Sequence, residues 1–197
     1  IGKNKKPDVP IVGDLKQVIS ALNKEIAKDE KLYNHAEWIK QVQEWKKEYP
    51  VMYKAVPEDK LVPQEVLEEL DKIIKGNAII TTDVGQHQMW AAQYLSYENP
   101  DHMITSGGAG TMGFGMPAAV GAQIAMPDKK VISISGDGGF QMTFQELMML
   151  KQYNLPVKVI ILNNSFLGMV RQWQEIFNEK RYSFVDLDHN PDFIKIG

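Results

Sequence analysis

From residue 63 onward, short apolar runs alternate with longer stretches whose apolar residues recur at helical spacing. The apolar runs are rich in β-branched residues on both faces, which is typical of parallel strands covered by helices on two sides. These predicted strands lie at 78–85, 102–106, 131–139 and 157–164. The predicted helices lie at 63–74, 86–95, 116–125, 143–153 and 168–177. The pattern therefore predicts an α/β fold with a doubly wound, mostly parallel sheet and helices on both faces.

The first third of the chain has a different character. Residues 1–26 hold an apolar run at 9–12, interpreted as a strand, and an amphipathic helix capped by Asp14, so we interpret them as the tail of a preceding domain. Residues 27–62 are highly charged and predict a helical linker whose tryptophans, Trp38 and Trp45, pack on a neighbouring domain. Residues 63–197 form the third predicted segment, a truncated ligand-binding domain.

Both chain ends suggest a piece of a longer protein. The first residue is isoleucine rather than methionine, and residues 190–197 predict the first turns of a helix with Asn190 as N-cap and Pro191 at its first position. That pattern stops without a helix-closing signal. We therefore expect further sequence at both ends.

Composition limits the function classes. Hydrophobic residues make up 44% and charged residues 24%, as in an ordinary globular protein. The net charge of −3 and the lack of a basic stripe give no support for nucleic-acid binding. The sequence has no cysteine, which fits a reducing, cytoplasmic location, and no apolar run or leader pattern that indicates a membrane or secreted protein.

Two short segments carry the strongest chemical signal. Gly136-Asp137-Gly138-Gly139 follows one predicted buried strand, and Asn163-Asn164 follows the next. Ligands of open α/β sheets bind at the carboxyl ends of such strands. The glycines allow the backbone to approach a phosphate closely. Two further loops, 84–87 and 107–115, are predicted at the same edge, so the four loops together indicate a ligand site.

Oxygen donors at these positions suit a magnesium ion. Magnesium takes six oxygen ligands and usually keeps several from phosphate and water. Asp137 and Asn164 offer side-chain oxygens, and the backbone carbonyl of Phe166 offers a third. The spacing therefore predicts a divalent cation that carries a diphosphate.

A dinucleotide-binding domain, which would make the chain a non-catalytic nucleotide-binding module, is an alternative interpretation. Residues 108–113 match G-x-G-x-x-G, follow a predicted strand and precede a helix, and Asp137 could be the acid that binds a ribose. The strand at 102–106 is short and polar for the centre of such a fold. This alternative also leaves the GDGG segment and the paired asparagines unexplained.

These motifs resemble those of the thiamine-diphosphate enzymes. Within that superfamily, segments 84–93, 107–119, 136–143 and 163–174 resemble the catalytic subunits of biosynthetic acetolactate (acetohydroxyacid) synthases, and GMVRQWQ at 168–174 is the most specific of them. The resemblance covers residues 63–190 and extends more weakly to residue 1. Other thiamine-diphosphate enzymes, such as pyruvate oxidases and decarboxylases, are the first alternative to this assignment, and the nucleotide-binding module is the second.

The resemblance implies roles for individual residues. Asp137, Asn164 and the Phe166 carbonyl would bind Mg²⁺. The remaining implied cofactor contacts are Val84, Gly85, Gln86, His87, Gly110, Met112, Gly136, Gly138, Gly139, Leu167, Gly168 and Met169. Among these, Gln86 and His87 would contact the diphosphate, Gly110 the aminopyrimidine, and Met112 would support the bent cofactor. The implied substrate-pocket residues are Met169, Val170 and Trp173.

The resemblance also implies a reaction and partners. Such enzymes decarboxylate pyruvate and join the two-carbon unit to a second 2-oxoacid in branched-chain amino-acid biosynthesis. The catalytic subunit would form a homodimer or tetramer, bind a small regulatory subunit and carry FAD in its middle domain. The activating glutamate would lie upstream in the partner subunit, so no catalytic residue is assigned here, Glu146 is interpreted as structural, and the chain alone is expected to be inactive.

Overall fold

The structure is a computed structural model that describes residues 2–28, 34–53, 57 and 60–197. The chain divides into two compact units, Ile1–Val51 and Met52–Gly197, which we describe separately. Parts of the predicted linker at 27–62 lie outside the described residues.

The described residues of the first unit form two helices, neither of which contains a buried residue. Helix α1 spans Leu15–Ile26 and α2 spans Ala36–Glu48. Asp14 caps α1 as predicted, because its carboxylate accepts a hydrogen bond from the Gln17 amide at 3.0 Å. Trp38 and Trp45 pack edge to face on each other, with ring centroids 5.5 Å apart. The predicted strand at 9–12 is wrong; Pro10 has no amide to donate, and none of the described residues pairs with this run.

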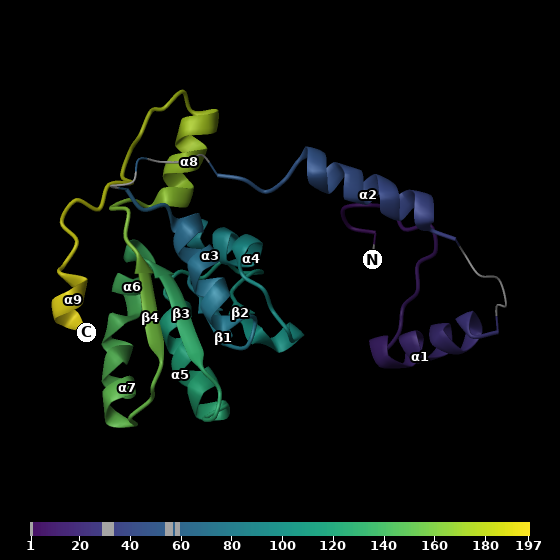
Figure 1. The fold of residues 1–197 in the computed structure, drawn as a ribbon, viewed down its shortest axis with the longest axis horizontal. Helices are drawn as coiled ribbons and strands as arrows, with labels where there is room; N and C mark the ends of the chain where they lie inside the picture. Colours follow the sequence, from purple (N-terminus) through teal and green to yellow (C-terminus); the bar gives the residue numbers. More distant parts are fainter. Residues whose placement is uncertain (1, 29–33, 54–56, 58–59) are drawn as a thin grey trace. The chain divides into compact units, whose positions relative to one another are not determined.

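The second unit contains a four-stranded parallel sheet in the order β2-β1-β3-β4 (Figure 1). The strands are β1 (Ile79–Thr82), β2 (Met103–Thr105), β3 (Val131–Gly136) and β4 (Lys158–Leu162). The helices are α3 (Pro63–Ile74), α4 (Gln86–Tyr94), α5 (Gly115–Ala125), α6 (Asp137–Thr143), α7 (Leu147–Gln152), α8 (Gly168–Phe177) and α9 (Phe193–Ile196). Short 3-10 helices span Pro100–His102 and Phe144–Glu146.

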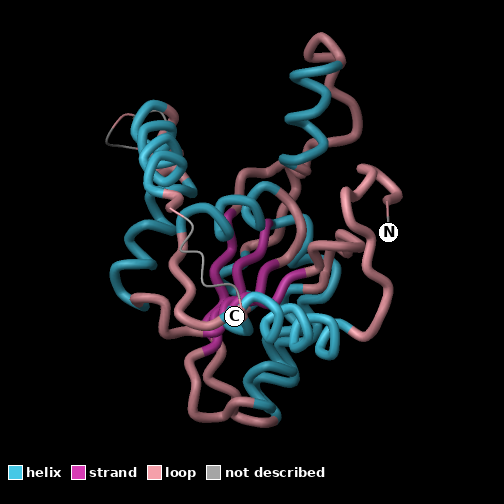
Figure 2. The backbone as a smooth tube through the Cα atoms, turned by 90° about the vertical axis from the view of Figure 1, so that its right-hand side faces the viewer, coloured by secondary structure: helices cyan, strands magenta, loops and turns pink. Residues whose placement is uncertain are grey.

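Apolar side chains cover the sheet on both faces, because successive strand residues point to opposite sides. On one face, Ile80, Ile132 and Ile134 pack with buried residues of α3 and α4. On the other face, Ile79 and Val131 pack with Ala119 and Ala122 of α5. Figure 2 shows the strands running side by side with helices along them. The predicted doubly wound α/β fold is confirmed.

Strand order creates a switch point between β1 and β3. From β1 the chain crosses to β2 on one side, then returns past β1 to β3 and continues to β4 on the other side. The loops after β1 and β3 therefore diverge at neighbouring carboxyl ends and leave a crevice between them.

Three local predictions are wrong. The segment after β3 is not a loop, since α6 begins directly at Asp137, and the predicted helix at 143–153 is divided by the 3-10 turn at Phe144–Glu146. Asn190 does not cap the last helix. The carboxylate of Asp192 does so, by accepting hydrogen bonds from the Ile194 and Lys195 amides at 3.2 and 3.3 Å.

Candidate cofactor site

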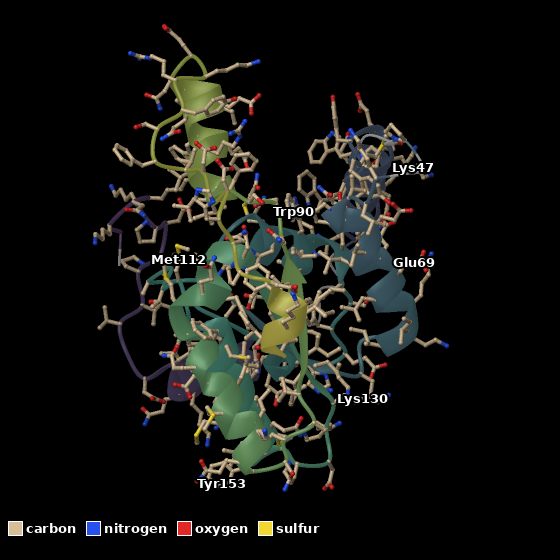
Figure 3. The ribbon with its side chains drawn as sticks, turned by 90° about the vertical axis from the view of Figure 1, so that its left-hand side faces the viewer. Lys47, Glu69, Trp90, Met112, Lys130 and Tyr153 are labelled. Carbon is tan, nitrogen blue, oxygen red and sulfur yellow. The ribbon has the colours of Figure 1, made fainter. Side chains whose placement is uncertain are left out.

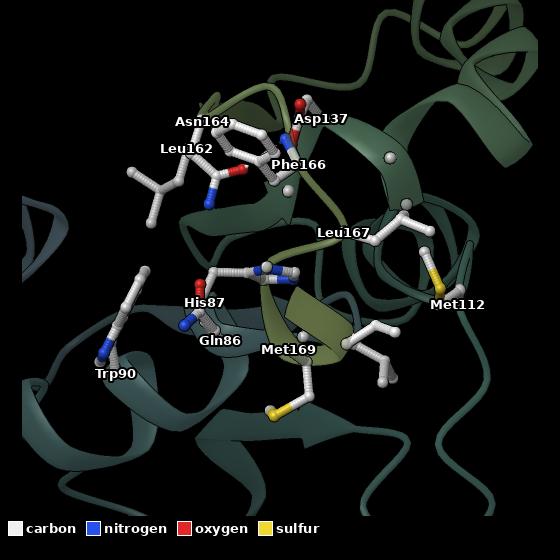
Figure 4. A pocket seen from close by; sticks show the side chains of 17 residues that line it. Gln86, His87, Trp90, Met112, Asp137, Leu162, Asn164, Phe166, Leu167 and Met169 are labelled. Carbon is white, nitrogen blue, oxygen red and sulfur yellow. Dashed lines mark hydrogen bonds between the residues drawn. The ribbon is translucent and has the colours of Figure 1, made fainter. Parts of the chain in front are cut away.

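The carboxyl ends of β1, β3 and β4 meet at one pocket (Figure 4). Its lining consists of Val84, Gly85, Gln86, His87, Trp90, Met112, Gly136, Asp137, Gly138, Gly139, Leu162, Asn164, Phe166, Leu167, Gly168, Met169 and Val170. In Figure 3, Trp90 and Met112 lie toward one end of the unit, and Lys130 and Tyr153, which precede β3 and β4, lie toward the other.

The pocket brings together all the predicted site residues except Gly110 and Trp173. Gly110 lies beside it, because a Cβ atom built there would be 4.0 Å from the Val84 side chain. Trp173 lies on α8 with its side chain 59% exposed and packs against Phe177, ring centroids 5.1 Å apart.

The three predicted metal ligands come from two neighbouring strand ends. Asp137 follows β3 and is only 2% exposed, whereas Asn164 and Phe166 belong to the loop after β4. The Asn164 side-chain oxygen accepts a hydrogen bond from the Phe166 amide at 3.0 Å, and Ser165 between them has a φ of +60°. This tight turn keeps the side chain of Asn164 close to the backbone of Phe166.

Two glycines allow the pocket walls to approach each other. A Cβ atom on Gly139 would overlap the Asp83 carboxylate, and one on Gly168 would overlap the Gln86 side-chain oxygen. Gln86 also donates a hydrogen bond to the Gln172 side chain at 2.9 Å, which ties α4 to α8. A larger residue at 139 would therefore displace the Asp83 carboxylate, whereas one at 168 would require the end of the Gln86 side chain to move aside.

His87 lies near the centre of this group of side chains, and it is 6% exposed (Figure 4). Its Nε2 atom is buried and has no hydrogen-bond partner among the described residues. Burial lowers the pKa of His87 below its ordinary value, while Asp83 and Asp137 oppose that shift only in part. An unpartnered, buried ring nitrogen is costly unless a ligand completes its hydrogen bonding.

Sequence reasoning missed Asp83, the fully buried residue after β1. Its carboxylate accepts hydrogen bonds from the amides of Val84 at 2.7 Å, Gly113 at 3.1 Å and Gly115 at 3.2 Å. Asp83 therefore fastens the loop after β1 to the start of α5. The one available signal was an aspartate at the end of an apolar strand.

Trp90, Leu162 and Asn190 were also missed. Trp90 lies one helical turn after Gln86 on α4, so the two share a face, and Leu162 is the last residue of β4. Asn190 donates a hydrogen bond from Nδ2 to the Asp137 carboxylate at 2.7 Å.

The structure does not favour the dinucleotide alternative. A nucleotide phosphate would need free amides where the glycine-rich loop enters α5. The Gly113 and Gly115 amides there already donate to Asp83. Gly108 and Gly110 do not line the pocket that holds Asp137.

Comparison with known families agrees with this geometry. Residues 83–197 match the model of the thiamine pyrophosphate enzyme, C-terminal TPP binding domain. The chain belongs to this family. Its match begins at Asp83 and includes α4, β3, α6, β4 and α8, the elements around the pocket.

Relatives with similar sequences are acetolactate synthases. The chain is 50% identical over 193 residues to the acetolactate synthase large subunit of Lactococcus lactis, covering 98% of this chain and 33% of that protein. It is 49% identical to a probable acetolactate synthase large subunit of Methanococcus aeolicus and 46% identical to the mitochondrial catalytic subunit of Saccharomyces cerevisiae, covering all of this chain and 35% and 29% of those proteins. The chain thus spans about a third of each relative.

The described residues show neither a membrane-spanning helix nor a cluster of ionisable metal ligands. No helix there combines the length and apolar character needed to cross a bilayer. No group of three or more His, Cys, Asp or Glu side chains there is arranged to hold a metal. The predicted magnesium ligands are a different kind of set, with one carboxylate, one amide and one carbonyl.

Proposed function

We propose that this chain is the diphosphate- and Mg²⁺-binding part of an acetolactate synthase catalytic subunit. The observation that carries the proposal is the meeting of Asp137, Asn164 and Phe166 in one glycine-lined pocket of a thiamine pyrophosphate binding domain. Similarity to acetolactate synthases at 46–50% identity supports the narrower assignment.

The residues fit the proposed groups in three respects. The donor set is made of oxygens, as Mg²⁺ requires. Gly136, Gly138 and Gly139 line the pocket where α6 begins, and the backbone amides of this first turn have no partner within the helix. His87 offers a buried Nε2 atom that has no hydrogen-bond partner in the described part of the chain, and burial disfavours its charged form.

The residues that the resemblance singles out then have the following proposed tasks. Asp137 and Asn164 hold the cation through side chains and Phe166 through its carbonyl, while Gln86 and His87 hold the diphosphate. Bound thiamine diphosphate supplies the electron sink for decarboxylation. The other proposed tasks are cofactor orientation by Val84, Gly85, Gly110, Met112, Leu167 and Gly168, and lining of the substrate pocket by Met169, Val170 and Trp173.

The whole protein would convert pyruvate and a second 2-oxoacid into acetolactate or acetohydroxybutyrate. We further propose that its catalytic subunits pair, that a small regulatory subunit binds them, that FAD lies in another domain, and that the enzyme is cytoplasmic. These proposals rest on resemblance to whole acetolactate synthases, of which this chain spans about a third.

Calorimetry with the purified chain tests the cofactor assignment. Thiamine diphosphate should bind only with Mg²⁺ present, NAD should not bind, and Asp137→Ala should abolish Mg²⁺-dependent binding. Asp128→Ala is the matched control, because Asp128 is exposed and lies in the turn before β3. Binding by NAD alone, or unchanged binding by Asp137→Ala, would contradict the assignment.

A further inference from the structure

The residues from Tyr182 to Asn190 form a strap against the loop after β4. The Leu167 amide donates to the Val185 carbonyl and the Leu187 amide to the Ser165 carbonyl, both at 2.8 Å. Val185 is fully buried. The strap therefore holds both sides of Phe166, which is itself bridged to Asp186.

An arginine strengthens the start of the strap. The Arg171 guanidinium of α8 stacks 4.1 Å from the ring centroids of both Phe166 and Tyr182. Such stacking favours one arrangement of the two rings. These contacts hold the strap, which ends at Asn190, against α8 and the loop after β4.

The Asn190 side chain joins three parts of the pocket rim. Its Nδ2 donates to the Asp137 Oδ2 at 2.7 Å and to the Asn163 Oδ1 at 3.0 Å. Its Oδ1 accepts from the Gln141 Nε2 at 2.8 Å, and that nitrogen also donates to the Asp137 carbonyl at 3.1 Å. Every donor meets an acceptor, so the network fixes the orientation of the amide.

The network leaves part of Asp137 available. Asn190 engages Oδ2, and no hydrogen bond to Oδ1 is found among the described residues. A neutral amide fixes the plane of the carboxylate without bringing a second charge beside it. It also sets the separation between Asp137 and the Asn163–Asn164 turn, which follow different strands.

We propose that Asn190 is a positioning residue for the metal site, which holds Asp137 and the Asn163–Asn164 turn in the arrangement that accepts Mg²⁺. The inference rests on the proposed function and extends it to a residue outside the pocket lining. Outer contacts of this kind commonly change metal affinity by about 10- to 100-fold.

Titration of Mg²⁺ at fixed thiamine diphosphate, followed by calorimetry, tests the proposal on the purified chain. Asn190→Ala should raise the Mg²⁺ concentration needed for half-maximal binding about 10-fold or more, and excess Mg²⁺ should restore binding. Asn178→Ala, a change at an exposed asparagine after α8, should leave that concentration unchanged.

A second variant separates positioning from folding. Asn190→Asp places a carboxylate beside Asp137, so its melting temperature without metal should fall, and Mg²⁺ should raise it more than in the unsubstituted chain. Should Asn190→Ala fail to fold, Gln141→Met keeps Asn190 but removes the donor to its oxygen and to the Asp137 carbonyl, and it should raise the Mg²⁺ requirement about 3-fold or more.

The outcomes are distinct. Lower melting temperatures with an unchanged Mg²⁺ requirement would show that Asn190 is only structural and would overturn the inference. An unsubstituted chain that binds neither Mg²⁺ nor thiamine diphosphate would overturn the proposed function itself.

Discussion

Asp83 and Asp137 occupy matching places on neighbouring strands. Asp83 follows β1 and Asp137 is the first residue after β3, and both are almost fully buried, at 0% and 2% exposure. Their partners differ. Asp83 receives three backbone amides, whereas Asp137 receives one side-chain amide on a single oxygen.

This difference separates an acid that builds the site from one that can bind a ligand. Both oxygens of Asp83 accept hydrogen bonds from backbone amides, and these bonds hold the loop after β1 against the start of α5. Asp137 keeps acceptor capacity and lines the pocket. Burial at a strand end is therefore an incomplete signal for a ligand-binding acid, since the remaining hydrogen-bonding capacity decides the role.

Substitution of Asp83 should have the largest effect on stability. Asp83→Ala leaves three amides without their acceptor, and hydrogen bonds to charged groups contribute about 1.5–3 kcal/mol each, so we expect a loss of about 4.5 kcal/mol or more. Asp137→Ala should cost about 1.5–3 kcal/mol because it removes one such bond. Urea unfolding at pH 7 measures the free energy of unfolding of both variants. Equal losses would contradict the difference that we infer between the two acids.

Gly139→Ala tests how closely the backbone of α6 packs against the Asp83 carboxylate. Its methyl group would overlap the Asp83 carboxylate, so the loop must shift, and we expect a loss of about 2–3 kcal/mol. Gly121→Ala on α5 is the matched control, because nothing lies within 4 Å of the added atom. It should be neutral or stabilise the helix by up to about 1 kcal/mol. Similar losses in both variants would argue against the close packing.

The buried histidine between the two acids should give a smaller, pH-dependent effect. The pKa of His87 is lowered by burial, so below pH about 6.5 the unfolded chain gains a proton that the folded chain does not. Stability should fall as the pH decreases from 7 to 5.5, by at most about 1.4 kcal/mol per pH unit from this group. His87→Gln should flatten that dependence, while His189→Gln, at an exposed position, should preserve it. The same pH dependence of stability in the unsubstituted protein and in both variants would contradict this role of His87.

The sequence was sufficient to predict the four strands of the sheet, because these depend on local apolar runs. Asp137 and Asn164 were predicted for the same reason, since they lie one and two residues after the ends of β3 and β4. The tie between Asn190 and Asp137 spans 53 positions, and the amides bound by Asp83 lie up to 32 positions away. Such contacts depend on tertiary structure and leave no local pattern. The start of α6 was missed because glycines at 138 and 139 disfavour a helix.

Trp173 should give the smallest change in stability. It lies outside the pocket lining and is 59% exposed, and its ring packs on Phe177. An exposed aromatic pair of this kind contributes about 0.5–1.5 kcal/mol, and leucine retains part of the apolar contact, so Trp173→Leu should cost about 0.5 kcal/mol or less in urea unfolding. Substitution of the buried acids should therefore reduce the free energy of unfolding much more than substitution of this exposed ring.

The effect of Trp173→Leu on function should be larger than its effect on folding. Pyruvate and 2-oxobutyrate differ by one methylene, and an apolar pocket wall distinguishes such substrates by about 1–3 kcal/mol. Competition between the two acceptors in the complete enzyme should therefore show a changed product ratio, while Mg²⁺-dependent cofactor binding stays as in the unsubstituted protein. Phe177→Leu is the control, because it removes the other ring of the same exposed pair. An equal change in product ratio for both variants would assign the effect to general packing of α8, and an unchanged ratio in Trp173→Leu would remove this residue from the proposed substrate pocket.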